Sequence, residues 1–229
     1  MTCDLFIADR LYSSWSLRGW LLFRDFGLPF NENLVGLYAG TMSEDMKPVA
    51  PARLVPAIKT ADGTTVGESV AIAETLAELY PDAGLWPSDP AQRATARWLA
   101  SEMAAGFGAL RGDCPMQLLS VYSGFQPSDA VRKDLARLNT LWSHARTMAG
   151  TSSGWLFGEI SAADVFFAPV AARVVGYNLP VTKMVRVYCD HWLANEHFKE
   201  WRKMGLAEAT PHNPYPIDLP KLPWPGDAD

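Results

Sequence analysis

The first 37 residues alternate between short apolar runs and one longer segment with helical spacing. Residues 3–9 (CDLFIAD) are short and apolar, which predicts a buried strand. Residues 15–26 (WSLRGWLLFRDF) carry apolar groups at helical intervals and stop at Gly27, a typical residue after a helix C-terminus, just before Pro29. Residues 32–37 (ENLVGL) predict a second strand. The chain therefore begins strand, helix, strand.

Residues 38–69 predict a loop followed by a hairpin. The loop over 38–53 has one helical turn near 43–48. A first strand then runs to Thr60, and a second strand ends at Val66. The Asp62-Gly63 dipeptide between them is a typical two-residue hairpin turn.

A helix completes this first region, and the pattern changes after it. Residues 69–80 (SVAIAETLAELY) are amphipathic and end at Pro81, which cannot continue a helix. The order βαβαββα over residues 1–80 predicts a small α/β domain. Residues 81–90 (PDAGLWPSDP) form a Pro/Gly/Asp-rich linker.

Beyond the linker, residues 91–208 show helical patterns in place of strand patterns, which predicts an all-α domain. The predicted helices cover 91–111, 128–149, 161–175, 181–194 and 196–204. The tail at 209–229 contains six prolines, so we expect it to lie extended over the surface.

Composition narrows the function classes. The chain has 229 residues, 48% of them hydrophobic, and a formal net charge of −5, with no dense basic run to attract nucleic acid or an anionic membrane. No stretch approaches the roughly 18 apolar residues of a membrane span, and the charged N-terminus does not resemble a signal peptide. Three scattered cysteines fit a reducing cytoplasm and predict neither a disulfide scaffold nor a metal site.

Three serines lie where the first strand gives way to the first helix. Ser13, Ser14 and Ser16 stand within the run LYSSWSLRGW. A hydroxyl at this position either caps the helix or takes part in chemistry, and the run alone favours capping.

Val55-Pro56 lies between the loop and the hairpin. A proline entering a strand removes one hydrogen-bond donor of the sheet ladder, and it can be cis. The main chain of Val55 would then be free to pair with a peptide laid alongside it. The alternative is an ordinary edge proline.

The sequence GESVAI (67–72) opens the helix after the hairpin. We expect Ser69 to cap that helix, because a hydroxyl together with free N–H groups at a helix N-terminus binds a carboxylate well. Glu68 beside it offers a charge for an ammonium group. The alternative is a capped helix with a solvated glutamate.

Residues 159–165 (EISAADV) match a helix-start motif. Ser161 and Asp164 have the spacing of a capping box, in which each side chain accepts a hydrogen bond at the start of the helix. We predict a structural role for this pair and assign it to no site.

Taken together and in this order, these motifs resemble the cytosolic glutathione transferase family over nearly the whole chain. The resemblance implies a thioredoxin-like N-terminal domain and an all-helical C-terminal domain. The stretch SSWSLR is most similar to the zeta-like serine transferases, whose motif has a cysteine where this chain has Trp15. That difference argues against the isomerase activity typical of the zeta class, to the extent that this activity requires the cysteine.

The resemblance also implies a binding mode for glutathione, an extended tripeptide. Its γ-glutamyl carboxylate would meet Ser69 and its ammonium Glu68, while its cysteine main chain would pair with Val55 beside Pro56. Its glycine carboxylate needs a cation, and the two candidates are Arg53 and Lys47.

In this family a hydroxyl donates a hydrogen bond to the glutathione sulfur and favours the thiolate. The resemblance places that hydroxyl at Ser13, with Ser14 the close second, Tyr12 a competitor and Ser16 structural. The thiolate would attack a small electrophile held against the helical domain. The residues expected to line that pocket are Trp98, Met103, Phe107 and Tyr122.

The family further implies a homodimer. Two alternatives to conjugation stay open: a non-catalytic protein that binds glutathione or apolar ligands, and a zeta-like isomerase of the maleylacetoacetate type. Thiol–disulfide exchange is disfavoured, because serine and tryptophan occupy the nucleophile position.

Overall fold

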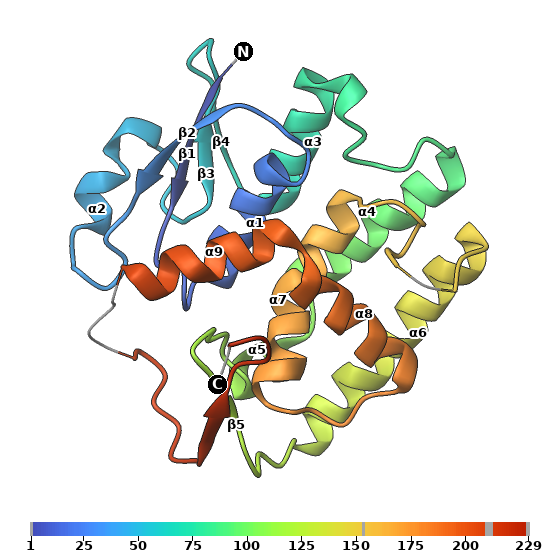
Figure 1. Cartoon of the computed structure of the whole chain (residues 1–229). Coiled ribbons are helices and arrows are strands. Elements are labelled where there is room, and N and C mark those ends of the chain that lie inside the picture. Colours follow the sequence, from blue (N-terminus) through green and yellow to red (C-terminus); the bar gives the residue numbers. More distant parts are fainter. Residues whose placement is uncertain (1, 153, 209–212, 228–229) are drawn as a thin grey trace.

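The N-terminal domain is a thioredoxin-like α/β unit, as the sequence predicts. A computed structural model describes residues 2–152, 154–208 and 213–227. The elements of the first domain are β1 (Cys3–Ile7), α1 (Ser14–Arg24), β2 (Phe30–Leu34), α2 (Met42–Asp45), η1 (Lys47–Val49), β3 (Ala57–Lys59), β4 (Thr65–Gly67) and α3 (Ser69–Leu79). The strands form one mixed sheet in the order β2-β1-β3-β4, in which only β1 and β2 are parallel (Figure 1).

Alternation along β1 explains the two layers around this sheet. Leu5 and Ile7 join the large core that includes α1 and α3, whereas Phe6 packs with Met46 and Val49 on the opposite face. Because successive side chains of a strand point to opposite faces, a short apolar strand can be buried on both sides.

The register of the sheet brings three distant segments to one edge. Ala57 at the start of β3 pairs with Phe6 near the end of β1, and also with Gly67 at the end of β4. The residues that follow β1, precede β3 and follow β4 therefore leave the sheet at the same end. These are the segments with the serine run, Val55-Pro56 and Glu68-Ser69.

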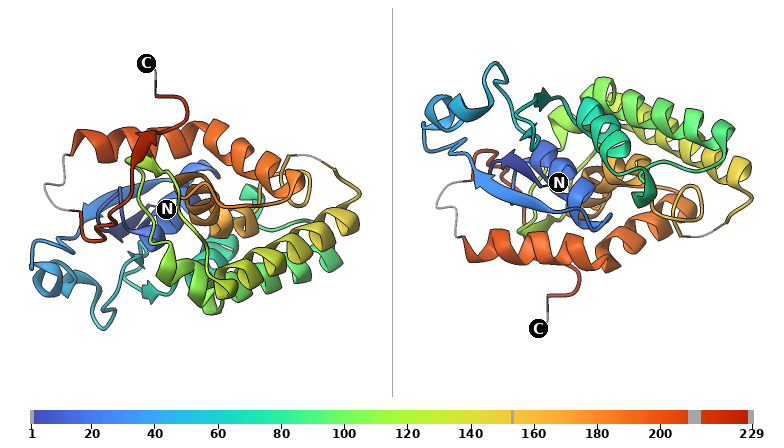
Figure 2. Two further views of the ribbon diagram at one scale, coloured as in Figure 1. Left: turned by 90° about the horizontal axis from the view of Figure 1, so that it is seen from below. Right: turned by 90° about the horizontal axis from the view of Figure 1, so that it is seen from above.

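The second domain is helical and is centred on α7. Its elements are η2 (Pro81–Ala83), α4 (Pro90–Ala105), α5 (Gly108–Asp113), α6 (Asp129–Ala149), α7 (Ala162–Gly176), α8 (Lys183–Ala194) and α9 (Glu196–Ala207), with a two-stranded ribbon of β5 (Ser120–Tyr122) and β6 (Lys221–Pro223). Every residue of α7 is buried. Figure 2 shows α7 enclosed by neighbouring helices in both views.

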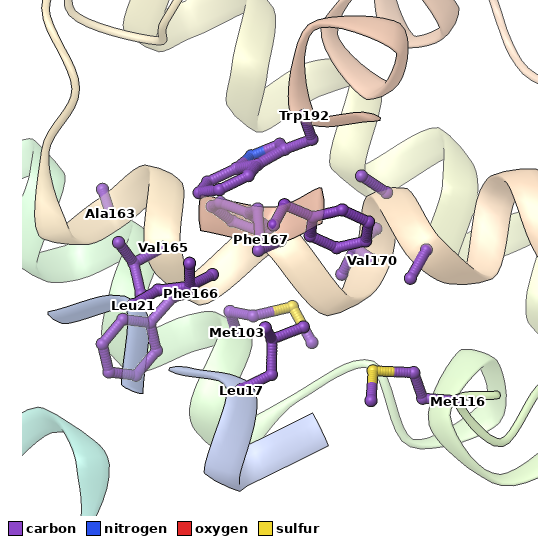
Figure 3. Packing of buried hydrophobic residues seen from close by; sticks show 14 of the residues in the cluster. Leu17, Leu21, Met103, Met116, Ala163, Val165, Phe166, Phe167, Val170 and Trp192 are labelled. Carbon is purple, nitrogen blue, oxygen red and sulfur yellow. The ribbon is translucent and has the colours of Figure 1, made fainter. Parts of the chain in front are cut away.

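The two domains share one core. Helix α1 contacts α7 directly, and α7 also contacts α4 and α8. Figure 3 shows Leu17 and Leu21 of α1 close to Phe166 of α7 and Met103 of α4. The N-terminal end of α1 is therefore held from both domains.

The helix predicted over 91–111 is wrong as a single element. It divides into α4 and α5, because Gly106 is extended and Phe107 has a left-handed backbone with φ of 57°. Few residues other than glycine adopt that conformation, so the type of residue 107 does not predict the break. The glycines on either side of it, Gly106 and Gly108, are the sign of the break in the sequence.

The capping box at the start of α7 is confirmed. The carboxylate of Asp164 accepts hydrogen bonds from the Ser161 backbone N–H (2.9 Å) and from its hydroxyl (2.8 Å). Its other oxygen accepts from the Leu156 N–H and the Tyr188 hydroxyl, each at 3.0 Å. Complete burial raises the pKa of Asp164 to about 6.

The predicted Pro-rich tail at 209–229 lies partly outside the described residues, at 209–212 and 228–229. The described part returns to the body of the protein. Its strand β6 pairs with β5, Trp224 is buried, and Asp227 forms an ion pair with Arg202. Within the described ranges, no helix is both long enough and apolar enough to cross a membrane.

Candidate active site

A cavity of about 710 Å³ opens at the N-terminal end of α1. Both domains and the tail contribute to its wall. The lining residues are Tyr12, Ser13, Ser14, Trp15, Leu37, Tyr38, Met42, Leu54, Val55, Gly108, Arg111, Gly112, Pro115, Met116, Arg173 and Tyr215. Ser13, Ser14 and Val55 therefore share one cavity.

Ser13 is the N-cap of α1. Its Oγ accepts a hydrogen bond from the Ser16 N–H at 3.3 Å and donates one to the Ser16 Oγ at 2.8 Å. The Ser16 Oγ also accepts from the Ala8 N–H at 2.8 Å. Ser16 is fully buried, so this network ties the start of α1 to the end of β1.

Ser14 is the first residue of α1 and is less buried than Ser13. Its Oγ accepts a hydrogen bond from Nη2 of Arg173 at 3.4 Å. Its backbone carbonyl accepts one from Nη1 of Arg18 at 3.2 Å. Two arginines thus hold Ser14, one through the side chain and one through the main chain.

Trp15, which stands where the zeta motif has cysteine, is packed against arginines. The guanidinium of Arg18 lies 4.3 Å from the centroid of the indole, and that of Arg111 lies 5.0 Å from it. Both distances are typical of cation–π interactions. Arg18 is completely buried, which lowers its pKa well below the usual value, and the nearby Arg173 and Arg111 lower it further.

Arg173 is buried and rigidly held. Its Nε donates to the Cys114 carbonyl at 2.8 Å and its Nη1 to the Pro169 carbonyl at 3.2 Å. Burial, and then repulsion from Arg111, lower its pKa to about 10. It therefore stays charged at neutral pH. The described residues that line the cavity include two arginines and no carboxylate, so the cavity favours an anion.

The Val55–Pro56 peptide bond is cis, one of the two possibilities that the sequence leaves open. Val55 lines the cavity, and Pro56 packs against α1 at Gly19. A Cβ added to Gly19 would lie 2.5 Å from the Cβ of Pro56, so glycine is needed for this close approach.

Ser69 was predicted to be the N-cap of α3, and this is wrong by one residue. Glu68 is the N-cap, since its carbonyl accepts the Ile72 N–H at 2.9 Å, and Ser69 is the first helical residue. Glu68 has φ of 62° and ψ of 121°, a sparsely populated conformation that is found mainly at functional sites. Glu68 is exposed and Ser69 is buried.

The two candidate cations, Arg53 and Lys47, are both exposed. Lys47 forms an exposed ion pair with Glu44 at 2.5 Å. Neither contributes to the cavity wall, and their assignment to glutathione stays a prediction.

The four residues predicted to bind the electrophile do not line the cavity. Trp98 is 47% exposed and packs with His144 and Arg137, whereas Met103, Phe107 and Tyr122 belong to the core. The break before α5 explains the difference, because it turns a new set of residues toward α1. That wall consists of Gly108, Arg111, Gly112, Pro115 and Met116.

Sequence reasoning also missed a group of tyrosines and the buried arginine. Tyr38 follows β2 and Tyr215 belongs to the tail, and their hydroxyls are 3.2 Å apart. Both rings meet the Tyr12 ring edge to face, at centroid distances of 6.4 and 6.3 Å. The sign of Arg173 in the sequence is a charged residue within the otherwise apolar run FFAPVAARVV.

Within the described residues, no group of three or more His, Cys, Asp or Glu side chains is placed to hold a metal ion. The chemistry that the cavity offers comes from hydroxyls, guanidinium groups and the N-terminus of α1. Such groups bind anions and donate hydrogen bonds to them.

Comparison with known proteins shows the family of the chain. The model of the glutathione S-transferase N-terminal domain matches residues 12–79. A probable maleylacetoacetate isomerase of Caenorhabditis elegans is 34% identical over 174 residues, covering 76% of this chain and 79% of that protein. The maleylacetoacetate isomerase of Rattus norvegicus is 30% identical over 155 residues, covering 66% and 67%.

Solved structures share the fold at lower identity. A glutathione transferase homolog from Burkholderia, crystallised with glutathione, has a TM-score of 0.62 at 23% identity and covers 90% of this chain and 99% of that chain. Glutathione transferase Omega 2S from Trametes versicolor has a TM-score of 0.68 at 20% identity, covering 92% and 99%. The prediction of family and fold is confirmed: the chain belongs to the glutathione transferase family.

Proposed function

We propose that this protein is a glutathione transferase in which a serine hydroxyl at the start of α1 activates the glutathione thiol for attack on a small electrophile. One observation carries the proposal. Ser13 and Ser14 lie at the N-terminal end of α1 in the same cavity as Val55.

Glutathione fits the edge of the sheet where the three segments meet. Its cysteine main chain lies along Val55, and its γ-glutamyl group lies at Glu68 and Ser69. The unusual backbone of Glu68 supports this placement, because strained residues of this kind cluster at ligand sites. The glycine carboxylate of glutathione forms an ion pair with Arg53 or Lys47. The exposed pair of Lys47 with Glu44 is weak enough to exchange for this partner.

The serine stabilises the thiolate and is not itself the nucleophile. A free thiol has a pKa of about 8.5, so only a few per cent is ionised at neutral pH. A hydrogen bond to a charged group is worth about 1.5–3 kcal/mol, which lowers the pKa by about one to two units. The positive end of α1 adds to this effect.

The electrophile occupies the remainder of the cavity, against α5, Met116 and Tyr215. This wall combines apolar surface with the guanidinium groups of Arg111 and Arg173. The protein works as a homodimer in the cytoplasm. Its three buried free cysteines are consistent with a reducing compartment.

A second candidate is a glutathione-dependent isomerase, because the two relatives described above carry that name. Trp15 argues against it, since it replaces the cysteine of the zeta motif. Turnover of maleylacetoacetate, compared with conjugation of an aryl halide, distinguishes the two reactions.

The thiol pKa tests the proposal. The ultraviolet absorbance of the bound thiolate is followed against pH for the wild type, Ser13→Ala and Ser14→Ala. We expect a bound pKa below that of free glutathione and a rise in at least one variant. Absence of glutathione binding contradicts the proposal. Binding to the wild type with a thiol pKa equal to that of free glutathione identifies a non-catalytic binding protein.

A further inference from the structure

The hydroxyl groups of Ser13 and Ser14 have different partners. The hydrogen of Ser13 is directed to the Ser16 Oγ at 2.8 Å, inside a network that also includes the Ala8 N–H. Ser13 is 8% exposed and serves as the N-cap of α1. Donation from Ser13 to a thiol would therefore break a bond that holds the start of the helix.

Ser14 is held from the opposite side. The partner of its Oγ is an arginine nitrogen, and a guanidinium can only donate hydrogen bonds. The Ser14 Oγ is thus the acceptor in this contact, and its own hydrogen must point away from Arg173. Ser14 lines the cavity, so a ligand there can receive that hydrogen.

Arg173 is suited to fix this direction. Two of its three nitrogens are bound to backbone carbonyls, of Cys114 and Pro169, and these anchors leave Nη2 for Ser14. Arg173 is 4% exposed, so its guanidinium has little freedom to turn away. Arg18 holds the backbone carbonyl of the same serine.

We propose that Arg173 is a positioning residue that makes the Ser14 hydroxyl, and not that of Ser13, the hydrogen-bond donor to the glutathione thiol. This inference rests on the proposed function, because it requires glutathione in the cavity. It assigns part of the thiol activation to α7 of the helical domain.

The charge of Arg173 acts in the same direction. A cation that donates to a hydroxyl oxygen polarises its O–H group and makes it a better donor. Arg111 stands in the same cavity, and the described lining has no carboxylate to neutralise the pair. The thiolate of glutathione, bound beside Ser14, supplies a negative charge that balances these two arginines.

The experiment measures the pKa of the bound thiol, which a purely structural residue does not change. Arg173→Met is compared with Arg146→Met. Arg146 is also 4% exposed and also donates to backbone carbonyls, those of Ser152 and Gly154, but it does not line the cavity. We expect Arg173→Met to raise the bound-thiol pKa by about one unit, a tenfold loss of thiolate below that pKa, and Arg146→Met to leave it unchanged.

A double-mutant cycle separates positioning from direct charge. If Arg173 acts through Ser14, Arg173→Met has a much smaller effect in a Ser14→Ala background than in the wild type. Equal effects in the two backgrounds overturn the inference, as does a larger rise in pKa for Ser13→Ala than for Ser14→Ala.

Two further outcomes are informative. If Arg173→Met does not fold, Arg173→Lys is measured in its place. Lysine retains the charge but lacks the fork that reaches Cys114, Pro169 and Ser14 together, so we expect the thiol pKa still to rise. An unchanged pKa then contradicts the role of Arg173. If the wild type does not bind glutathione, the proposed function itself is contradicted. This outcome is distinct from failure of the inference about Arg173, in which glutathione binds but its thiol pKa does not depend on Arg173.

Discussion

The starts of α1 and α7 are built from similar residues but are used differently. At α7, Ser161 and Asp164 are both buried, and the carboxylate accepts four hydrogen bonds. At α1, the capping role falls to Ser13, and Ser14 faces a cavity. We therefore expect a serine at a helix start to take part in chemistry only where a cavity reaches it and its hydrogen is not already donated within the protein.

The largest effect is expected at α7. Asp164→Ala leaves two backbone N–H groups and two hydroxyls without their buried partner, which we expect to lower the free energy of unfolding by about 4 kcal/mol. Chemical denaturation measures it, and Asp190→Ala on the exposed face of α8 is the control. A loss below about 1 kcal/mol would show that the α7 start is not the stabilising one.

The same carboxyl makes stability depend on pH. Its pKa is about 6 in the folded protein against an ordinary value of 3.8, so its contribution is fully present below pH 3.8 and is lost as the pH rises through 6. The shift in pKa corresponds to a loss of at most about 3 kcal/mol in the free energy of unfolding. Subtracting the stability profile of Asp164→Asn from that of the wild type isolates it. A difference that grows between pH 4 and pH 6 contradicts the assignment.

At the start of α1, we expect the substitution Ser14→Ala to change turnover and to leave stability nearly unchanged. Ser14 is not the cap, so Ser14→Ala is expected to change the free energy of unfolding by less than about 0.5 kcal/mol. Loss of its hydrogen bond should reduce turnover with glutathione about tenfold below the thiol pKa. Steady-state rates across pH, together with denaturation curves, check both. Loss of stability without loss of turnover would make Ser14 a structural residue.

The smallest effect is expected from the matching change at α7. Ser161→Ala should cost about 1 kcal/mol of stability, the usual value for a lost N-cap, and leave the bound-thiol pKa unchanged. Thermal unfolding and thiolate absorbance are the two measurements. A shift in thiol pKa would show that the two helix starts are coupled through the core between α1 and α7.

Local motifs could be read from the sequence because their interactions lie within a few residues. The Ser161–Asp164 box spans three residues, and Val55-Pro56 needs only its own peptide bond. The βαβαββα order follows from periodicity, and the linker from its prolines and glycines. The pairing of β3 with β1 and β4 then places the serine run, Val55-Pro56 and Glu68-Ser69 at the same end of the sheet.

The wall opposite the serines could not be read in the same way. The α5 residues that line the cavity follow the left-handed backbone of Phe107, and phenylalanine as a residue type does not predict that conformation. Met103 was expected at the substrate and lies in the core, while Arg111 was missed. Tyr215 contacts Tyr38 across 177 positions of sequence, a separation that local patterns do not encode.

The return of the tail has a consequence for how the site is completed. Residues 213–227 leave the ribosome after both domains, and they bring Tyr215 to the cavity and Trp224 into the core. A chain shortened after α9 would keep the share of the lining that the two domains supply, but it would lack Tyr215 and the pairing of β6 with β5. The cavity would then be open on that side.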